Sequence, residues 1–220
     1  MPRLLFEKVG SAVFISHLDL MRVFQRAFRR GGILIRHSQG FSPRAHVSIA
    51  LPLSVGAESI CELLDFDLAE GITVPLEEIP QRLNRTMPDG IRVLGIWDSG
   101  RKLRELTHLD AELTLEYDNG VPADCTERIE SLFQQPSILV EKHTKNGTAL
   151  VDIRPMLIDL QVAQPNDNSL RLRCRVCAQN PSLNPALLAT AIVRYLPQDQ
   201  PDAAWVRRIE ILDWDGNPFR

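Results

Sequence analysis

Acidic residues are scarce at the start of this chain of 220 residues. Residues 1–50 contain eight lysines and arginines but only two acidic residues, Glu7 and Asp19. The whole chain has a formal net charge of −3, so residues 51–220 are strongly acidic. A basic segment on an otherwise acidic protein predicts an anionic partner that binds at one place, although solvated surface arginines would give the same composition.

Several other features are missing, and each absence excludes a class of protein. No run approaches the roughly 18 apolar residues of a membrane span, and charged residues interrupt the first apolar stretch too early for a signal peptide. The four cysteines are scattered, which is typical of reduced thiols in a chain large enough to fold without disulfides. We therefore expect a cytoplasmic protein with no membrane segment.

The motifs of the common cofactor and hydrolase sites are missing as well. The sequence contains no Walker loop, no GxGxxG or HExxH pattern, no nucleophile elbow and no CxxxCxxC triad. Cys174 and Cys177 have the spacing of a zinc pair, but strand alternation places them on opposite faces, so they cannot share a metal. We expect no metal and no cofactor, and an accessory protein rather than an enzyme.

The same alternation places Arg171, Arg173 and Arg175 on the solvent side of a predicted strand. This secondary basic stripe could bind an anion. Equally, its arginines could pair with acidic residues on neighbouring strands. The candidates for such pairing are Glu112, Glu116 and Asp159.

The most informative stretch is a predicted helix that begins after Ser16. Ser16 is a typical N-cap, Asp19 three residues on completes a capping box, and Gly31 and Gly32 end the helix. One side of this helix carries Leu20, Met21, Val23, Phe24, Ala27 and Phe28, and the other carries Arg22, Arg26, Arg29 and Arg30. One face therefore packs into a core, and the opposite face presents a row of guanidinium groups.

A polar loop, residues 38–44, follows this helix and adds hydroxyl, amide, aromatic and guanidinium groups. That mixture suits a phosphate or a stacked base, although Phe41 could equally pack on the sheet. The predicted nucleic-acid-binding residues are Arg22, Arg26, Arg29, Arg30, Ser38, Gln39, Phe41 and Arg44.

Among the histidines, only His17 has a position that suggests chemistry, because it lies in the first turn of the arginine-bearing helix. A neutral imidazole there could act as a general base on a ribose hydroxyl. The alternative is a histidine at the helix entry that bonds to the backbone. No residue is predicted to be catalytic unless the protein is a ribonuclease.

The apolar periodicity predicts alternating strands and helices along the first half of the chain. The predicted strands are 3–9 with a continuation at 12–15, 33–36, 45–53, 61–68 and 91–97. In the strand at 61–68 we expect Asp65 and Asp67 to face solvent. A second helix is marked by Ile79 and Leu83, which gives the order strand, helix, two strands, helix, strand.

The second half repeats this order with more strand. The predicted strands are 111–117, 138–143, 149–153, 158–162, 170–178 and 205–214, with a turn at 145–147. Asp124 and Glu127 form a capping-box signal for one helix, and Pro185 opens another. We predict an α+β fold of two tandem ferredoxin-like (βαββαβ, RAMP-like) domains with antiparallel sheets. The N-terminal domain, with the basic helix, spans residues 1–99 and the C-terminal domain spans residues 107–220.

Five segments carry a family resemblance: residues 3–10, 15–22, 26–30, 38–44 and 49–56. With Ser-His-Leu-Asp at 16–19 and Ser-Gln-Gly-Phe at 38–41, the chain resembles the bacterial radical SAM-linked protein family, a domain of unknown function. The resemblance implies a radical SAM enzyme as partner, because such domains occur fused to, or encoded beside, one. This chain lacks the catalytic part and would be the separate partner.

The first half is also similar to the RAMP-type folds of CRISPR repeat-processing endoribonucleases. Some of these place a histidine near the first helix, where His17 lies in this sequence. The chain departs from them because no glycine-rich loop lies near its C-terminus.

These observations favour a non-catalytic RNA-binding accessory protein that works with a radical SAM enzyme in RNA modification or processing. One alternative is a metal-independent endoribonuclease that uses His17. Another is a module that docks on the radical SAM enzyme without nucleic acid. A positive face is common to the first and the last, so the sequence does not separate them.

Overall fold

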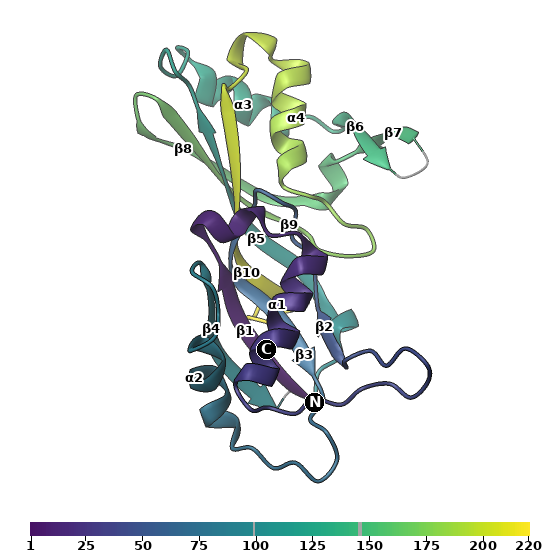
Figure 1. Cartoon of the computed structure of the whole chain (residues 1–220). Coiled ribbons are helices and arrows are strands. Elements are labelled where there is room, and N and C mark those ends of the chain that lie inside the picture. Colours follow the sequence, from purple (N-terminus) through teal and green to yellow (C-terminus); the bar gives the residue numbers. More distant parts are fainter. Residues whose placement is uncertain (99, 145–146) are drawn as a thin grey trace. The chain divides into compact units, whose positions relative to one another are not determined.

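The computed structural model of the chain describes residues 1–98, 100–144 and 147–220. The chain divides into two compact units (Figure 1). The N-terminal unit consists of residues 1–105 together with 218–220, and the second unit consists of residues 106–217. Of the turn predicted at 145–147, residues 145 and 146 lie outside the described part of the chain.

The N-terminal unit has one antiparallel sheet with the strand order β4-β1-β3-β2. Its elements are β1 (Pro2–Lys8), α1 (His17–Arg30), β2 (Val47–Ile49), β3 (Glu58–Phe66), α2 (Ile79–Asn84) and β4 (Ile91–Asp98), with 3-10 turns at Gly10–Phe14, Leu76–Glu78 and Leu103–Glu105. This is the predicted order of strand, helix, two strands, helix, strand.

Three predicted strand segments in this unit are wrong or too long. Residues 12–14 form part of a 3-10 turn, and residues 33–36 make only an isolated bridge between Ile35 and Leu68. The strand predicted at 45–53 is reduced to β2. Each segment contributes buried residues to the core, such as Val13, Ile33 and Ile49, but Phe14 and Leu34 are exposed. The apolar periodicity therefore predicted neither the extended ladder nor all of the burial in these segments.

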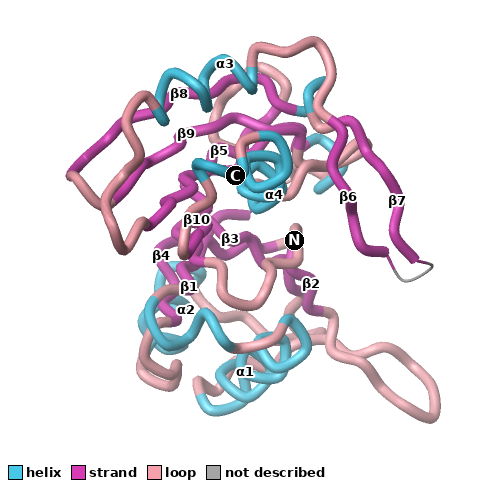
Figure 2. Tube along the Cα trace, turned by 90° about the horizontal axis from the view of Figure 1, so that it is seen from above, coloured by secondary structure: helices cyan, strands magenta, loops and turns pink. Residues whose placement is uncertain are grey.

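Helix α1 packs on the sheet through the apolar face that the sequence predicts. Leu20, Phe24, Ala27 and Phe28 are buried, and the Phe24 ring meets Phe6 of β1 edge-on at 4.7 Å. Helices α1 and α2 lie on the same side of β4, β1 and β3, where they enclose the core (Figure 2). The opposite face of α1 is left to its polar residues.

Two glycines end α1, as predicted. Gly32 has φ +69°, a left-handed conformation that glycine adopts without strain. It allows the Ile33 amide to donate back to the Phe28 carbonyl at 2.9 Å, and the Gly32 amide to donate to Arg29 at 3.2 Å. These two bonds form a Schellman motif, which turns the chain sharply at the helix end.

The second unit has a similar arrangement with one addition. Its elements are β5 (Leu106–Glu116), α3 (Cys125–Phe133), β6 (Leu139–Thr144), β7 (Gly147–Asp152), β8 (Leu157–Asn166), β9 (Ser169–Cys177), α4 (Ala186–Tyr195) and β10 (Ala203–Asp213), with 3-10 turns at Arg154–Met156 and Pro197–Asp199. Within this unit the antiparallel strand order is β10-β5-β9-β8, and β6 and β7 form a separate hairpin.

The capping box predicted at Asp124 and Glu127 is not formed. Asp124 has φ +55° and its side chain makes no capping bond to α3. An N-cap side chain normally reaches the helix amides from an extended backbone, and the left-handed backbone of Asp124 does not provide that geometry.

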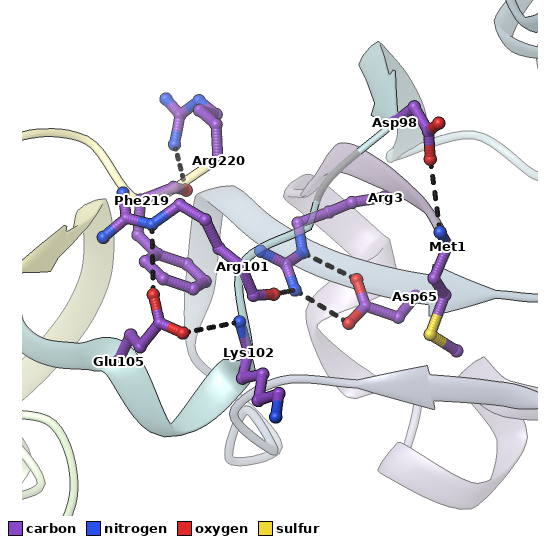
Figure 3. Close-up of polar contacts among 9 residues, drawn as sticks. All are labelled: Met1, Arg3, Asp65, Asp98, Arg101, Lys102, Glu105, Phe219 and Arg220. Carbon is purple, nitrogen blue, oxygen red and sulfur yellow. Dashed lines mark hydrogen bonds and ion pairs between the residues drawn. The ribbon is translucent and has the colours of Figure 1, made fainter.

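A buried ion pair joins β1 to β3 in the N-terminal unit (Figure 3). Arg3 Nε donates to Asp65 Oδ1 at 2.6 Å, and Nη2 donates to Oδ2 at 2.8 Å. Arg3 is only 1% exposed and Asp65 only 7%. The prediction that Asp65 faces solvent is wrong, because consecutive residues of β3 are buried on both faces of the strand.

The last three residues of the chain complete this site. Phe219 is fully buried, and the guanidinium carbons of Arg3 and Arg101 lie 4.8 and 4.5 Å from the centre of its ring. Arg3 Nη2 also donates to the Arg101 carbonyl oxygen at 2.9 Å. Residues 218–220 therefore belong to the N-terminal unit, whereas the predicted C-terminal domain of 107–220 included them.

We expect Asp65→Ala to destabilise the protein by about 3–5 kcal/mol, because it leaves the buried guanidinium of Arg3 without its carboxylate partner. The free energy of unfolding in urea measures this effect. Asp98→Ala is the matched control, since it removes an exposed carboxylate that pairs with the Met1 amino group at 3.2 Å. Such a pair contributes less than about 1 kcal/mol, so equal losses in the two variants would contradict the prediction.

Candidate functional site

A groove of about 890 Å³ lies in the N-terminal unit between α1 and the chain that follows it. Helix α1 provides one wall, from His17 to Arg29. The rest of the lining comes from residues 33–35, His37, residues 43–45, Val47 and Ala69. The groove thus lies along one edge of the polar face of α1 and reaches its apolar side at Leu18 and Met21.

Backbone hydrogen bonds hold the wall opposite α1. The Ala69 amide donates to the Leu34 carbonyl at 2.9 Å, and the Arg36 amide donates to the Asp67 carbonyl at 2.8 Å. The His46 amide in turn donates to the Arg36 carbonyl at 2.8 Å. Residues 34–36 are therefore fixed between two other segments, although they form no regular strand.

Ser38 and Arg44 close the loop that leaves this wall, seen beyond β2 in Figure 1. The Ser38 amide donates to the Arg44 carbonyl at 2.8 Å, and the Arg44 amide donates to Ser38 Oγ at 2.9 Å. Ser38, predicted to contact a ligand, thus has its hydroxyl engaged in shaping the loop. Gln39 and Phe41 are exposed, and the Phe41 ring does not pack on the sheet.

The structure divides the four arginines of α1 into two groups. Arg22 and Arg29, seven positions apart, line the groove with Arg44 from the opposite wall. Arg26 and Arg30 are exposed and lie outside the groove lining. This division follows from the helix geometry, because at about 100° per residue Arg22 and Arg29 lie within about 20° of each other around the axis. Arg26 and Arg30 are turned about 40° and 80° from Arg22, on the side away from Gln25.

Among the described residues, most of these arginines form no ion pair with an acidic side chain. Arg22 bonds to Asp19 at 2.8 Å. Within residues 1–98, 100–144 and 147–220, no ion pair or side-chain hydrogen bond is formed by Arg26, Arg29, Arg30, Arg36 or Arg44. The positive charge of this face is therefore available to a ligand.

Two histidines line the groove, His17 and His37, whereas only His17 was predicted to have a chemical role. His17 Nδ1 is buried and finds no hydrogen-bond partner among the described residues. His37 lies on the opposite wall, with Nδ1 3.0 Å from the Ile35 carbonyl oxygen. Gln25, on α1 between Arg22 and Arg29, was also missed. Gln25 could have been found from its helical spacing, but nothing in the sequence places His37 opposite α1.

The lining between these polar groups is apolar. Met21 of α1 and Ile33, Ile35 and Val47 from the other segments contribute aliphatic surface. Leu18 and Leu34 line the groove and are more than half exposed. The groove can therefore offer both cationic groups and apolar contact to one ligand.

Each arginine of the secondary basic stripe in the second unit has a carboxylate oxygen within 3.3 Å. Arg175 donates to both carboxylate oxygens of Asp110, at 2.7 and 2.9 Å, and this bonding raises the pKa of Arg175. Arg171 and Arg173 each approach Glu112 at 3.3 Å. The structure thus favours the cross-strand pairing alternative, with Glu112 as expected and Asp110 in addition. The expected Asp159 lies opposite Arg175 on β8 and contributes to its raised pKa, whereas Glu116 accepts from Trp205 instead.

The two cysteines of β9 point as the alternation predicts. Cys174 is buried with Leu172 and Val176, and burial raises its pKa to about 12, while Cys177 is partly exposed. In the part of the chain that the structure describes, no cluster of three or more His, Cys, Asp or Glu side chains could hold a metal ion. In that same part no helix is long and apolar enough to cross a membrane.

The N-terminus of α1 is fixed by a polar cluster at the end of the groove. The Asp19 amide donates to Ser16 Oγ at 3.2 Å, which is half of the predicted capping box. The other half differs, because the Asp19 carboxylate accepts from the Ser16 hydroxyl at 2.8 Å instead of from the cap amide. The bonds from Ser16 and then from Arg22 lower the pKa of Asp19 below its ordinary value of 3.8.

These features define an α+β protein with antiparallel sheets whose N-terminal unit has an arginine-lined groove. The chain belongs to a family described as an uncharacterized protein conserved in bacteria, DUF2344, which matches residues 2–185. This agrees with the expectation of a bacterial domain of unknown function. No curated protein matches the sequence.

Among solved structures, the chain is similar to one in the crystal structure of a Cbf5-Nop10-Gar1 complex, with 10% identity and a TM-score of 0.51. The match covers 96% of this chain and 48% of that one. A chain of the archaeal box H/ACA sRNP Nop10-Cbf5 complex has 9% identity and a TM-score of 0.47, with 94% and 46% covered. The chain thus spans about half the length of these proteins, and at such identities the likeness concerns the fold alone.

We expect Ser16→Ala to raise the pKa of Asp19 back toward 3.8, because it removes the first cause of the lowered value. A pH titration of the Asp19 carboxyl carbon by NMR measures this. The pKa of Asp19 is lower in the folded protein than in the unfolded one, so its ionised carboxylate stabilises the fold above about pH 4. This stabilisation is lost as the pH falls through the folded pKa.

The same variant loses the helix cap, which costs about 1 kcal/mol of stability at neutral pH. Ser48→Ala is the control, since Ser48 is exposed on β2 and makes no side-chain hydrogen bond among the described residues. An unchanged Asp19 titration in Ser16→Ala would show that another group sets its pKa.

Proposed function

We propose that this protein is a non-catalytic RNA-binding accessory protein and that the face around α1 binds the RNA. The observation that carries the proposal is the unpaired state of Arg26, Arg29, Arg30 and Arg44 among the described residues. Guanidinium groups are well suited to bind phosphates, because they present several donors in a planar fork.

The arginines of the second unit differ from those around α1, and this contrast supports the proposal. In the second unit, Arg171, Arg173 and Arg175 are all within 3.3 Å of a carboxylate oxygen. Unpaired cations on one face repel one another and oppose folding slightly, so a compensating anionic ligand is the simplest reason for such a cluster. An RNA backbone supplies many phosphates at close spacing and meets this need.

The proposed contacts keep the residues that the sequence suggested. Arg22, Arg26, Arg29, Arg30 and Arg44 would bind phosphates. Gln39 and Phe41, both exposed on the loop 38–44, would contact sugar and base, with the Phe41 ring as a stacking surface. Ser38 would act mainly through the shape of the loop.

We also propose a more detailed fold and a partner enzyme for this protein. The strand orders β4-β1-β3-β2 and β10-β5-β9-β8 support two tandem ferredoxin-like domains, approximately 1–99 and 107–220, with the hairpin β6–β7 as an addition to the second. The resemblance to the radical SAM-linked family supports a radical SAM enzyme in the cytoplasm as the partner. RNA modification or processing would be their joint task.

We expect RNA binding by this protein to weaken about a hundredfold between 50 and 200 mM salt, because neutralising about five phosphates releases their counterions. A salt-titrated gel shift with total cellular RNA measures this. Arg26→Glu combined with Arg30→Glu should abolish binding. The matched control is Arg92→Glu with Arg104→Glu, which makes the same charge change at exposed arginines of the same unit, on β4 and on the 3-10 turn at Leu103–Glu105.

Tight RNA binding that survives Arg26→Glu with Arg30→Glu would contradict the proposal. A protein that binds no RNA, but pulls down a partner enzyme only while these arginines are present, would favour docking without nucleic acid. Both results are read from the same purification at low salt.

A second candidate function, a metal-independent endoribonuclease, is favoured by the two histidines of the groove. His17 and His37 lie on opposite walls, as a general base and a general acid would on either side of a phosphodiester. This candidate predicts RNA cleavage in the presence of EDTA. His17→Ala would abolish the cleavage and leave RNA binding intact, and an absence of cleavage by the parent protein would exclude this function.

A further inference from the structure

We propose that the groove takes a single-stranded segment of RNA, with phosphates on the arginines of both walls and a base against the apolar floor. This inference rests on the proposed function and names the form of RNA that the site selects. It concerns the groove alone, whereas the exposed Arg26 and Arg30 lie outside its lining.

The size of the groove is the first argument. Its volume of about 890 Å³ falls within the range of roughly 300–1,000 Å³ in which pockets enclose a small organic ligand. A nucleotide in an open strand can enter such a space with its base splayed out. An A-form helix cannot, because its bases are stacked inside and its narrow major groove hides their edges.

The position of the charges is the second argument. Arg29 lies on α1 and Arg44 lies on the opposite wall, so guanidinium groups approach the groove from two sides. A strand that runs along the groove would place successive phosphates within reach of both. A duplex would meet the exposed arginines with its outer phosphates but would leave the floor of the groove empty.

The chemistry of the lining is the third argument. Met21, Ile33, Ile35 and Val47 give the aliphatic surface on which the flat face of a base can lie. Gln25 carries both a donor and an acceptor, as a base edge does, and it lies between two arginines on the same helix face. A site for phosphate alone would not need this apolar floor.

Gln25→Glu is the most direct test, because it changes one group in the groove and keeps its size. The new carboxylate would lie one turn from Arg22 and Arg29, pair with them and repel a phosphate. Gln81→Glu is the matched control: Gln81 is exposed on α2 and lies outside the groove lining. Both variants lower the net charge by the same amount, so any difference between them is local.

The probes are a fluorescein-labelled single-stranded RNA of mixed sequence and its duplex, with binding followed by fluorescence anisotropy at one salt concentration. We expect Gln25→Glu to weaken single-strand binding about tenfold, because it places like charges side by side. Its effect on the duplex should equal that of Gln81→Glu. Ala69→Trp, which adds bulk to a half-buried position in the lining, should give the same selective loss with the fold retained by circular dichroism.

Three other outcomes would overturn the inference. If Gln25→Glu and Gln81→Glu have equal effects on the single strand, while Arg26→Glu with Arg30→Glu still abolishes binding, RNA binding stands and the groove is not its site. If the parent protein binds neither RNA, the proposed function fails together with the inference. If a polyglutamate peptide binds as tightly as RNA and responds to Gln25→Glu, the groove is a peptide site.

Discussion

The buried ion pair between Arg3 and Asp65 is the constraint on which the N-terminal unit depends. Taking both charges out of water is costly, and two short hydrogen bonds in a fork geometry offset that cost only when β1 and β3 keep their register. Residues 67–69 follow β3 directly and hold the wall of the groove through their backbone bonds to residues 34–36. The register of the sheet thus sets the position of this wall.

The molecule uses arginine in three physically distinct ways. Arg3 is buried and satisfied, and the arginines of β9 form ion pairs across the sheet with Glu112 and Asp110. Those of α1 and of the loop 38–44 are exposed and mostly unpaired among the described residues. The first two groups stabilise the fold, whereas the third contributes repulsion to it. The difference lies in the neighbours and not in the residue, so the count of arginines alone carries no functional information.

Local patterns predicted the elements of this protein better than their contacts. The limits of α1 were predicted because Ser16, Gly31 and Gly32 act on the nearest backbone groups. The burial of Asp65 and the return of Phe219 to the N-terminal unit were missed, because each depends on a partner far along the chain. For the same reason the sequence showed a row of four arginines where the structure separates two that line the groove from two that do not.

The placement of Phe219 also determines the order in which the protein can be completed during its synthesis. The ring packs against Arg3 and Arg101, yet more than a hundred residues of the second unit are made between those arginines and Phe219. At about 5–20 residues per second, the ribosome needs roughly ten seconds to cover that distance. The N-terminal unit therefore lacks the ring that packs beside Arg3 until the second unit has been made.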